Sequence, residues 1–116
     1  YGIPNCDTVK RSRAWFDEHG IAYTFHDFKK QGVPAAQLDA WIAKLGWEPL
    51  VNKKGTTWRK LDAKVQSAII DAATARALML REPSVIKRPV VVLGEGARAT
   101  ITVGFAPDAW QVQAKP

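Results

Sequence analysis

Cysteine is scarce in this sequence of 116 residues, and Cys6 is its only representative. A single cysteine excludes a disulfide within the chain, so any redox cycle needs a thiol from outside it. It also favours a reducing compartment, and we expect a cytoplasmic protein. Histidine is nearly as rare. Two histidines lying far from the cysteine in sequence form no recognisable zinc-binding pattern, and we expect no metal.

Long apolar segments are also missing. No apolar run approaches the roughly 20 residues that cross a bilayer, and no signal-peptide pattern is present, so we expect no membrane partner. Internal repeats, low-complexity segments and a Gly-rich phosphate loop are absent as well. The chain begins at Tyr1 without a methionine, and we expect a few strand residues to precede it.

The composition is that of one globular domain, which we expect to be a monomer. Hydrophobic residues make up 47% of the chain and charged residues 24%, both ordinary values. The net charge of +6 fits an anionic small molecule, nucleic acid or an acidic partner surface. A solvated basic surface explains the charge most simply.

The beginning of the chain predicts a β-α-β unit. Tyr1–Ile3 resembles the end of a strand, and Ile21–Phe28 has the aromatic and β-branched residues of another strand. Between them we predict a helix over Thr8–His19, with Asp7 or Thr8 as its N-cap. Because a helix connects the two strands, we expect them to be parallel.

The middle of the chain predicts helices, and we place a helical insertion at about residues 34–82. After a loop at 29–34, four apolar residues at helical spacing form one stripe: Leu38, Trp41, Ile42 and Leu45. Asp62 and Asp71 are placed to cap two further helices, the second of which ends before Pro83.

The last third changes to the period of strands. Pro89–Leu93 has the composition of a buried strand, Gly94–Gly96 predicts a turn, and Thr100–Gly104 alternates polar and apolar residues, which together indicate a hairpin. Pro107 begins a short final helix. The whole order predicts an α/β protein of thioredoxin-like fold, with a small mixed sheet and an inserted helical segment.

Cys6 falls in the loop between the first strand and the first helix. Free N–H groups at a helix start and the helix dipole stabilise a thiolate, so we predict a pKa below the value of about 8.5 for free cysteine. Lys10 and other basic residues in the first turns add positive charge. The alternative is that Cys6 is a small buried apolar residue, as many single cysteines are.

Three blocks of the sequence are similar to the arsenate-reductase-related (ArsC/Spx) family, and most to its YffB-like branch of small bacterial proteins. They are Tyr1–Thr8, Gly55–Leu61 and Ile86–Pro89, in the family's order and over essentially the whole chain. The resemblance implies a single thioredoxin-like domain over residues 1–116. It also implies that Cys6 is nucleophilic and that Arg88 precedes a cis-proline at Pro89.

The sequence also departs from the family. Arsenate reductases of the family hold the oxyanion with three arginines, and only Arg88 matches one of them. Asn52 or Lys53 stands at the first position, and residues 100–104 contain no arginine, although Arg98 lies nearby. We therefore expect poor activity with arsenate. Val9 stands where a Spx-like Cys-X-X-Cys motif has its second cysteine, which excludes that disulfide switch.

The resemblance and the single thiol together suggest a glutathione-dependent thiol oxidoreductase. Its substrate would be an oxidised thiol or a small anion, glutathione would be a co-substrate, and we expect no tightly bound cofactor. Cys6 and Arg88 are the expected catalytic residues. The residues expected to bind substrate or glutathione are Asn5, Thr8, Lys10, Lys87 and Pro89. The alternative is a non-catalytic, Spx-like regulator that binds RNA polymerase.

Two further patterns each allow two interpretations. His26 beside Asp27 could form an acid–base pair, but adjacent strand residues point to opposite faces. The basic residues 53–60 around Trp58 could bind nucleic acid, but no recognition motif surrounds them and a solvated loop is the simpler interpretation. We do not expect nucleic acid as a partner.

Overall fold

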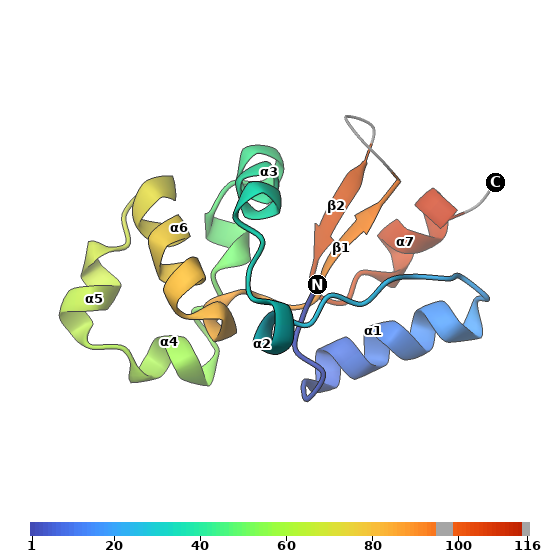
Figure 1. The fold of residues 1–116 in the computed structure, drawn as a ribbon, viewed down its shortest axis with the longest axis horizontal. Coiled ribbons are helices and arrows are strands. Elements are labelled where there is room, and N and C mark those ends of the chain that lie inside the picture. The colour runs from blue at the N-terminus through green and yellow to red at the C-terminus, as the bar shows by residue number, and fades with distance from the viewer. Residues whose placement is uncertain (95–98, 115–116) are drawn as a thin grey trace. The chain divides into compact units, whose positions relative to one another are not determined.

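The computed structural model describes residues 1–94 and 99–114 (Figure 1). Most of the turn predicted at Gly94–Gly96 lies outside these residues. The chain divides into two compact units, which we describe separately. The first comprises Tyr1–Phe28 and the residues from Arg88 onward, and the second comprises Lys29–Lys87. Within the described ranges, no helix has the length and apolarity needed to cross a bilayer.

The first unit contains the predicted hairpin. Strand β1 (Val90–Leu93) pairs antiparallel with β2 (Thr100–Val103), with Val90 opposite Val103. The prediction of a buried β1 is correct only for its first residue, because Val90 is fully buried whereas Val92 is 38% exposed. The two strands are followed by helix α7 (Pro107–Ala114), which begins at the residue predicted for the last helix.

Backbone hydrogen bonds extend the hairpin into a small mixed sheet. Tyr1 and Val90 exchange two N–H···O bonds of 2.8 and 2.9 Å, the pattern of an antiparallel pair. Gly2 forms a parallel bridge with Asp27, which confirms the predicted parallel direction. The predicted strand over Ile21–Phe28 is wrong in its extent, because only the end of this segment joins the sheet.

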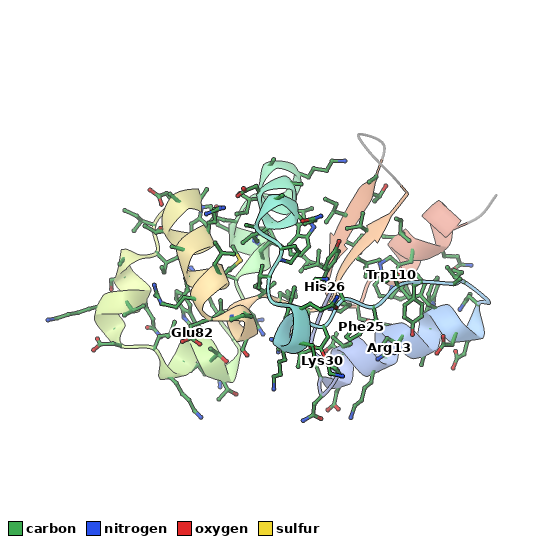
Figure 2. The ribbon with its side chains drawn as sticks, viewed as in Figure 1. Arg13, Phe25, His26, Lys30, Glu82 and Trp110 are labelled. Atoms are coloured by element: carbon green, nitrogen blue, oxygen red, sulfur yellow. The ribbon has the colours of Figure 1, made fainter. Side chains whose placement is uncertain are left out.

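Helix α1 (Asp7–Glu18) connects these two segments. The prediction of Asp7 or Thr8 as N-cap was wrong: both are helical, and Cys6 is the N-cap, with extended φ and ψ of −138° and 124°. The buried side of α1 carries Phe16, whose ring lies 4.9 Å from that of Trp110 in α7. Trp110, which is labelled in Figure 2, is completely buried, and its Nε1–H donates a hydrogen bond of 2.7 Å to Thr102 Oγ1.

The second unit is helical. The described elements after α2 (Phe28–Gln31) are α3 (Ala35–Leu45), η1 (Glu48–Leu50), α4 (Thr56–Lys60), α5 (Ala63–Ala68), α6 (Ala72–Arg81) and η2 (Pro83–Val85). Both predicted caps are confirmed, since Asp62 accepts a bond from Lys64 N–H and Asp71 forms a capping box with Thr74. The sequence predictions missed the short α2 and α4. Apolar side chains form the core of the unit, among them Leu38, Trp41, Leu50, Leu78, Met79 and Ile86.

Candidate functional site

The thiol of Cys6 stands at the start of α1. The preceding Pro4 and Asn5 are exposed and turn the chain from the sheet edge into the helix. Cys6 is half-buried, and its carbonyl accepts the first intrahelical bond from Lys10 N–H at 2.9 Å. Cys6 therefore lies in the predicted strand-to-helix loop but is itself the N-cap, with its sulfur close to amides that have no partner within the helix.

Four interactions together lower the pKa of the Cys6 thiol. Partial burial on its own raises that pKa, because it disfavours the charged thiolate. Two hydrogen-bond donors of the backbone, the N–H groups of Val9 and Thr8, lower it. The Arg88 guanidinium lowers it further through a hydrogen bond and through its positive charge, and these effects together outweigh the burial. The lowered pKa agrees with the prediction made from the helix start, and the sulfur faces a cation rather than a purely apolar core.

Arg88 reaches the thiol because of strand pairing. Since Tyr1 lies opposite Val90 in an antiparallel pair, Arg88 falls opposite Ile3, directly before the loop that carries Cys6. The Arg88–Pro89 peptide bond is cis, as the resemblance implied. Pro89 is buried, and its carbonyl accepts a bond of 2.8 Å from Gly104 N–H. The pairing of the first and third sheet segments thus positions the guanidinium.

The structure brings only some of the other predicted residues to the sulfur. Thr8 is one of them, and its backbone N–H donates a hydrogen bond to the sulfur. The side chains of Asn5, Lys10 and Lys87 are exposed, and Lys87 belongs to the second unit, where its N–H donates to Leu50 O at 2.7 Å. Their contribution to glutathione binding, like that of Pro89, stays a prediction.

One supporting residue was missed at the sequence level. Ser12 is buried in α1, and its hydroxyl donates a bond of 2.7 Å to the Thr8 carbonyl one turn earlier. Such a bond is common for serine inside a helix, and here it ties the turn that presents the Thr8 and Val9 amides. The sequence did contain a signal for this role, because Ser12 is a small polar residue on the same side of α1 as the buried apolar residues Val9 and Phe16.

The basic side chains of residues 53–60 are exposed, and one of them lies over two tryptophan rings. Lys53 Nζ lies 5.8 Å from the ring centroid of Trp47 and 5.6 Å from that of Trp58, within the range of cation–π contacts. Trp58 is half-buried, in line with a packing role. Among the described residues, no group of three or more His, Cys, Asp or Glu side chains is placed to hold a metal ion.

The fold and the site together define a thioredoxin-like α/β protein with a cysteine at the start of its first helix. The model of the ArsC family matches residues 1–112, and the chain belongs to this family. A solved structure of the YffB (PA3664) protein is 48% identical, with a TM-score of 0.89, over 99% of this chain and 96% of the other. The solution structure of an arsenate reductase (ArsC) related protein from Brucella melitensis is 47% identical, with a TM-score of 0.71. The match covers 100% of this chain and 92% of the Brucella chain.

Relatives known from sequence extend the comparison. An uncharacterized protein of Haemophilus influenzae is 40% identical over 92 residues, which are 79% of this chain and 80% of the relative. A more distant relative is the global transcriptional regulator Spx of Listeria innocua, 20% identical over 79% of this chain and 70% of its own. The proteins similar to this chain thus include one described as arsenate reductase related and one described as a transcriptional regulator.

Proposed function

We infer that the chain is a thiol oxidoreductase of the ArsC family that uses glutathione as its co-substrate. The observation that carries the proposal is the contact between the Arg88 guanidinium and the Cys6 sulfur, which lowers the pKa of the thiol. A thiolate is the attacking species in thiol–disulfide exchange, and a lowered pKa increases its fraction near neutral pH. The absence of a second cysteine assigns the resolving step to an external thiol.

The reaction proceeds in two exchange steps on a mixed disulfide of a substrate thiol with glutathione. The Cys6 thiolate attacks the glutathione sulfur, the S–S bond breaks, and the substrate leaves as a thiolate that takes up a proton. A second glutathione thiolate then attacks the glutathione sulfur of the Cys6 mixed disulfide. Cys6 is released as a thiolate and oxidised glutathione is the product, so the net reaction consumes one glutathione and reduces one substrate.

Each residue has a defined part in this scheme. Arg88 stabilises the thiolate and attracts the anionic substrate, because a guanidinium stays charged at all relevant pH values. The Thr8 and Val9 amides stabilise negative charge on the sulfur in both steps. Exposed Lys10 and Lys87 are the proposed partners of the glutathione carboxylates, and Asn5 adds a hydrogen bond in the loop. This chemistry belongs in a reducing compartment such as the cytoplasm.

A coupled assay tests the proposal. The full chain is supplied with 2-hydroxyethyl disulfide, glutathione, glutathione reductase and NADPH, and NADPH consumption is followed. Turnover is expected for the native chain, none for Cys6→Ser, and roughly tenfold less for Arg88→Ala, equivalent to about 1.4 kcal/mol. Arg59→Ala, which removes an exposed arginine of α4, is the matched control and should leave turnover unchanged. Equal turnover in Cys6→Ser would refute the mechanism.

The Spx relatives favour a second candidate, a non-catalytic regulator that binds RNA polymerase. Its basic surface would provide the contact, in keeping with the net charge of +6. A pull-down of purified RNA polymerase with the native chain and with Cys6→Ser separates the two functions. Binding by both variants without turnover in the coupled assay would assign the regulatory role.

A further inference from the structure

The second unit has a groove between two consecutive helices, α5 and α6 (Figure 1). Its volume is about 350 Å³, and its lining residues all belong to the segment 64–81. Val65, Ala68 and Ile69 line it from α5 and the residue after that helix, and Ala77 lines it from α6. Ala68 and Ala77 are exposed and have no side chain beyond Cβ, so this apolar groove has room for a side chain from another molecule.

The groove lies outside the core of the unit. Helix α5 buries none of its residues. The buried residues of α6 are Ala75, Leu78 and Met79. Ala77 and Arg81 line the groove instead, and because residues four apart share a helix face, they form a second side of α6. The fold therefore leaves this side of the two helices open.

Ile70, between the two helices, is mostly in solvent. Its exposed fraction of 73% is the largest among the large hydrophobic residues that the structure describes. An apolar residue directly before an N-cap often packs against the fourth residue of the helix, here Ala75, but the exposed fraction leaves most of Ile70 without such packing. Its backbone N–H donates a bond of 3.0 Å to Thr74 Oγ1, and Thr74 lines the groove. An exposed apolar residue thus adjoins the groove.

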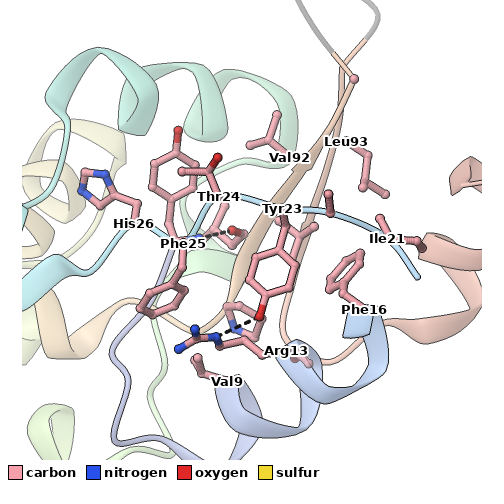
Figure 3. A pocket seen from close by; sticks show the side chains of 17 residues that line it. Val9, Arg13, Phe16, Ile21, Tyr23, Thr24, Phe25, His26, Val92 and Leu93 are labelled. Atoms are coloured by element: carbon pink, nitrogen blue, oxygen red, sulfur yellow. Dashed lines mark hydrogen bonds between the residues drawn. The ribbon is translucent and has the colours of Figure 1, made fainter. Parts of the chain in front are cut away.

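Two cations also line the groove. Lys64 of α5 and Arg81 of α6 are exposed, and among the described residues neither side chain has an ion-pair partner. A cavity of the first unit, shown in Figure 3, gives the contrast. There Arg13 Nε donates to Tyr23 Oη at 3.0 Å, and the guanidinium lies 4.4 Å from the Phe25 ring centroid. Arg13 is therefore engaged within the chain, whereas Lys64 and Arg81 can pair with an anionic group from outside.

The charge of the whole second unit has the same sign. Lys29–Lys87 contains 11 Lys and Arg residues and 5 Asp and Glu residues, so it carries the full formal net charge of +6 of the chain. Asp62 and Asp71 accept backbone N–H groups at the starts of α5 and α6, and Glu82 offsets part of the charge after the end of α6. A positive field around an apolar groove attracts an acidic partner and repels a basic one.

We propose that the groove between α5 and α6 binds an acidic amphipathic helix of a partner protein. Thr74 and Arg81 are seven residues apart, about 10 Å along α6, so the groove covers about two turns of such a helix. Apolar side chains of the partner, three or four residues apart, enter between Ala68 and Ala77. Carboxylates beside them pair with Lys64 and Arg81.

The same features argue against other occupants. A second copy of the chain brings the same excess of positive charge to the groove and is repelled. Nucleic acid satisfies the two cations, but its bases stack on aromatic rings, and the apolar residues that line the groove are aliphatic. An acidic amphipathic helix matches both the apolar lining and the cations.

Fluorescence anisotropy with the full chain tests the proposal. The probe is a fluorescein-labelled helical peptide with leucines along one side and glutamates elsewhere. We expect saturable binding, at least about tenfold tighter than that of a peptide of the same composition in scrambled order. Ala77→Glu places a like charge and a larger side chain in the groove and should weaken binding at least about tenfold.

A matched pair of charge reversals separates the groove from the net charge. Lys64→Glu should weaken binding of the probe about fivefold or more. Lys30→Glu changes the net charge equally at an exposed residue of α2 that does not line the groove, and it should weaken binding less than about twofold. Glutamate is a good helix former, and far-UV circular dichroism with thermal unfolding verifies that each variant is folded.

Nuclear magnetic resonance locates the bound probe. In a titration of the ¹⁵N-labelled chain, the amide signals that shift should be those of α5 and α6, with Ile70 and Ala77 among them. Cys6→Ser should bind the probe as the native chain does, so this proposal and the proposed oxidoreductase activity can fail separately.

Several results would overturn the proposal. They are the absence of saturable binding, an unchanged affinity in Ala77→Glu, and equal losses in Lys64→Glu and Lys30→Glu. Binding of single-stranded DNA that Ala77→Glu abolishes would assign the groove to nucleic acid instead. A dimer in sedimentation experiments that Ala77→Glu dissociates would assign it to a second copy of the chain.

Discussion

Arg88 donates a hydrogen bond to the sulfur of Cys6, although about 80 positions separate the two residues in the sequence. The pairing of Tyr1 with Val90 creates this contact, because it places the residues before β1 beside the loop after Tyr1–Ile3. The single cysteine is therefore held against a permanent cation at the start of a helix.

Removing the guanidinium should raise the pKa of the Cys6 thiol. In Arg88→Ala both the hydrogen bond and the positive charge are lost. Partial burial, which raises the pKa, is then opposed only by the backbone amides, so the pKa moves towards about 8.5. Alkylation by iodoacetamide as a function of pH measures it. Because a thiolate of higher pKa is also more nucleophilic, the rate at pH 7 should fall about threefold for each unit of the rise. Arg88→Lys should show a smaller effect, and an unchanged midpoint in Arg88→Ala would contradict the assigned contact.

The lowered thiol pKa also predicts how stability depends on pH. Since the folded pKa of Cys6 lies below the unfolded value of about 8.5, the unfolded chain binds more protons between the two values and stability rises with pH there. The contribution is fully present above the unfolded pKa and is lost as pH falls through the folded pKa. The free energies of unfolding of the native chain and of Cys6→Ser, measured with urea, should therefore converge as pH falls from about 8.5 through the lowered folded pKa. Parallel curves would show that the thiolate is not stabilised by folding.

Arsenate should be a poor substrate. Of the three arginine positions that the family resemblance implies, only Arg88 is filled, while Asn52 or Lys53 and residues 100–104 lack the guanidinium fork that binds an oxyanion in two places. Arsenate reduction measured with glutathione and glutaredoxin should be close to the rate without the protein. A true arsenate reductase serves as the positive control, and a comparable rate for this chain would refute the prediction.

Gly2 should not tolerate a side chain. A Cβ at this position would lie 2.9 Å from Val9 Cγ2, and Val9 is buried and β-branched, so it has little freedom to move. We expect Gly2→Ala to lower the free energy of unfolding by about 1–3 kcal/mol, as for other overpacked sites. Combined with Val9→Ala, the cost of Gly2→Ala should shrink, which a double-mutant cycle by urea unfolding measures. Strictly additive costs would mean that the two residues do not conflict.

The hydrogen bond of Trp110 should contribute to stability through its burial. Thr102→Val removes the acceptor of the Nε1–H and leaves a buried donor without this partner, which costs about 1–3 kcal/mol. Thr100→Val, on the same strand, is the matched control with no such bond to Trp110 and should cost less than about 0.5 kcal/mol. Thermal unfolding of both variants gives the comparison. A cost of Thr102→Val that persists in full beside Trp110→Phe would exclude the hydrogen bond as its cause.

Local chemistry was enough to predict much of this protein. Asp62 and Asp71 begin helices because their side chains accept backbone N–H groups a few residues away, a relationship contained within one turn. The spacing of Leu38 and Trp41 predicts a buried side of α3 in the same way. Cys6 at a helix start, and hence a stabilised thiolate, also follows from neighbouring residues alone. The short helices α2 and α4 escaped prediction because a few residues carry too little periodic signal.

Long-range pairing was decided only by the tertiary structure. Tyr1 and Val90 are 89 positions apart, and no local pattern says that their backbones exchange hydrogen bonds. The family resemblance named Arg88, but the pairing of strands brings its guanidinium to the sulfur. The same holds for Ile21–His26, whose strand-like composition is real but whose backbone pairs only at its end. A strand is stabilised by hydrogen bonds to a neighbouring segment, and the local sequence does not say which segment that is.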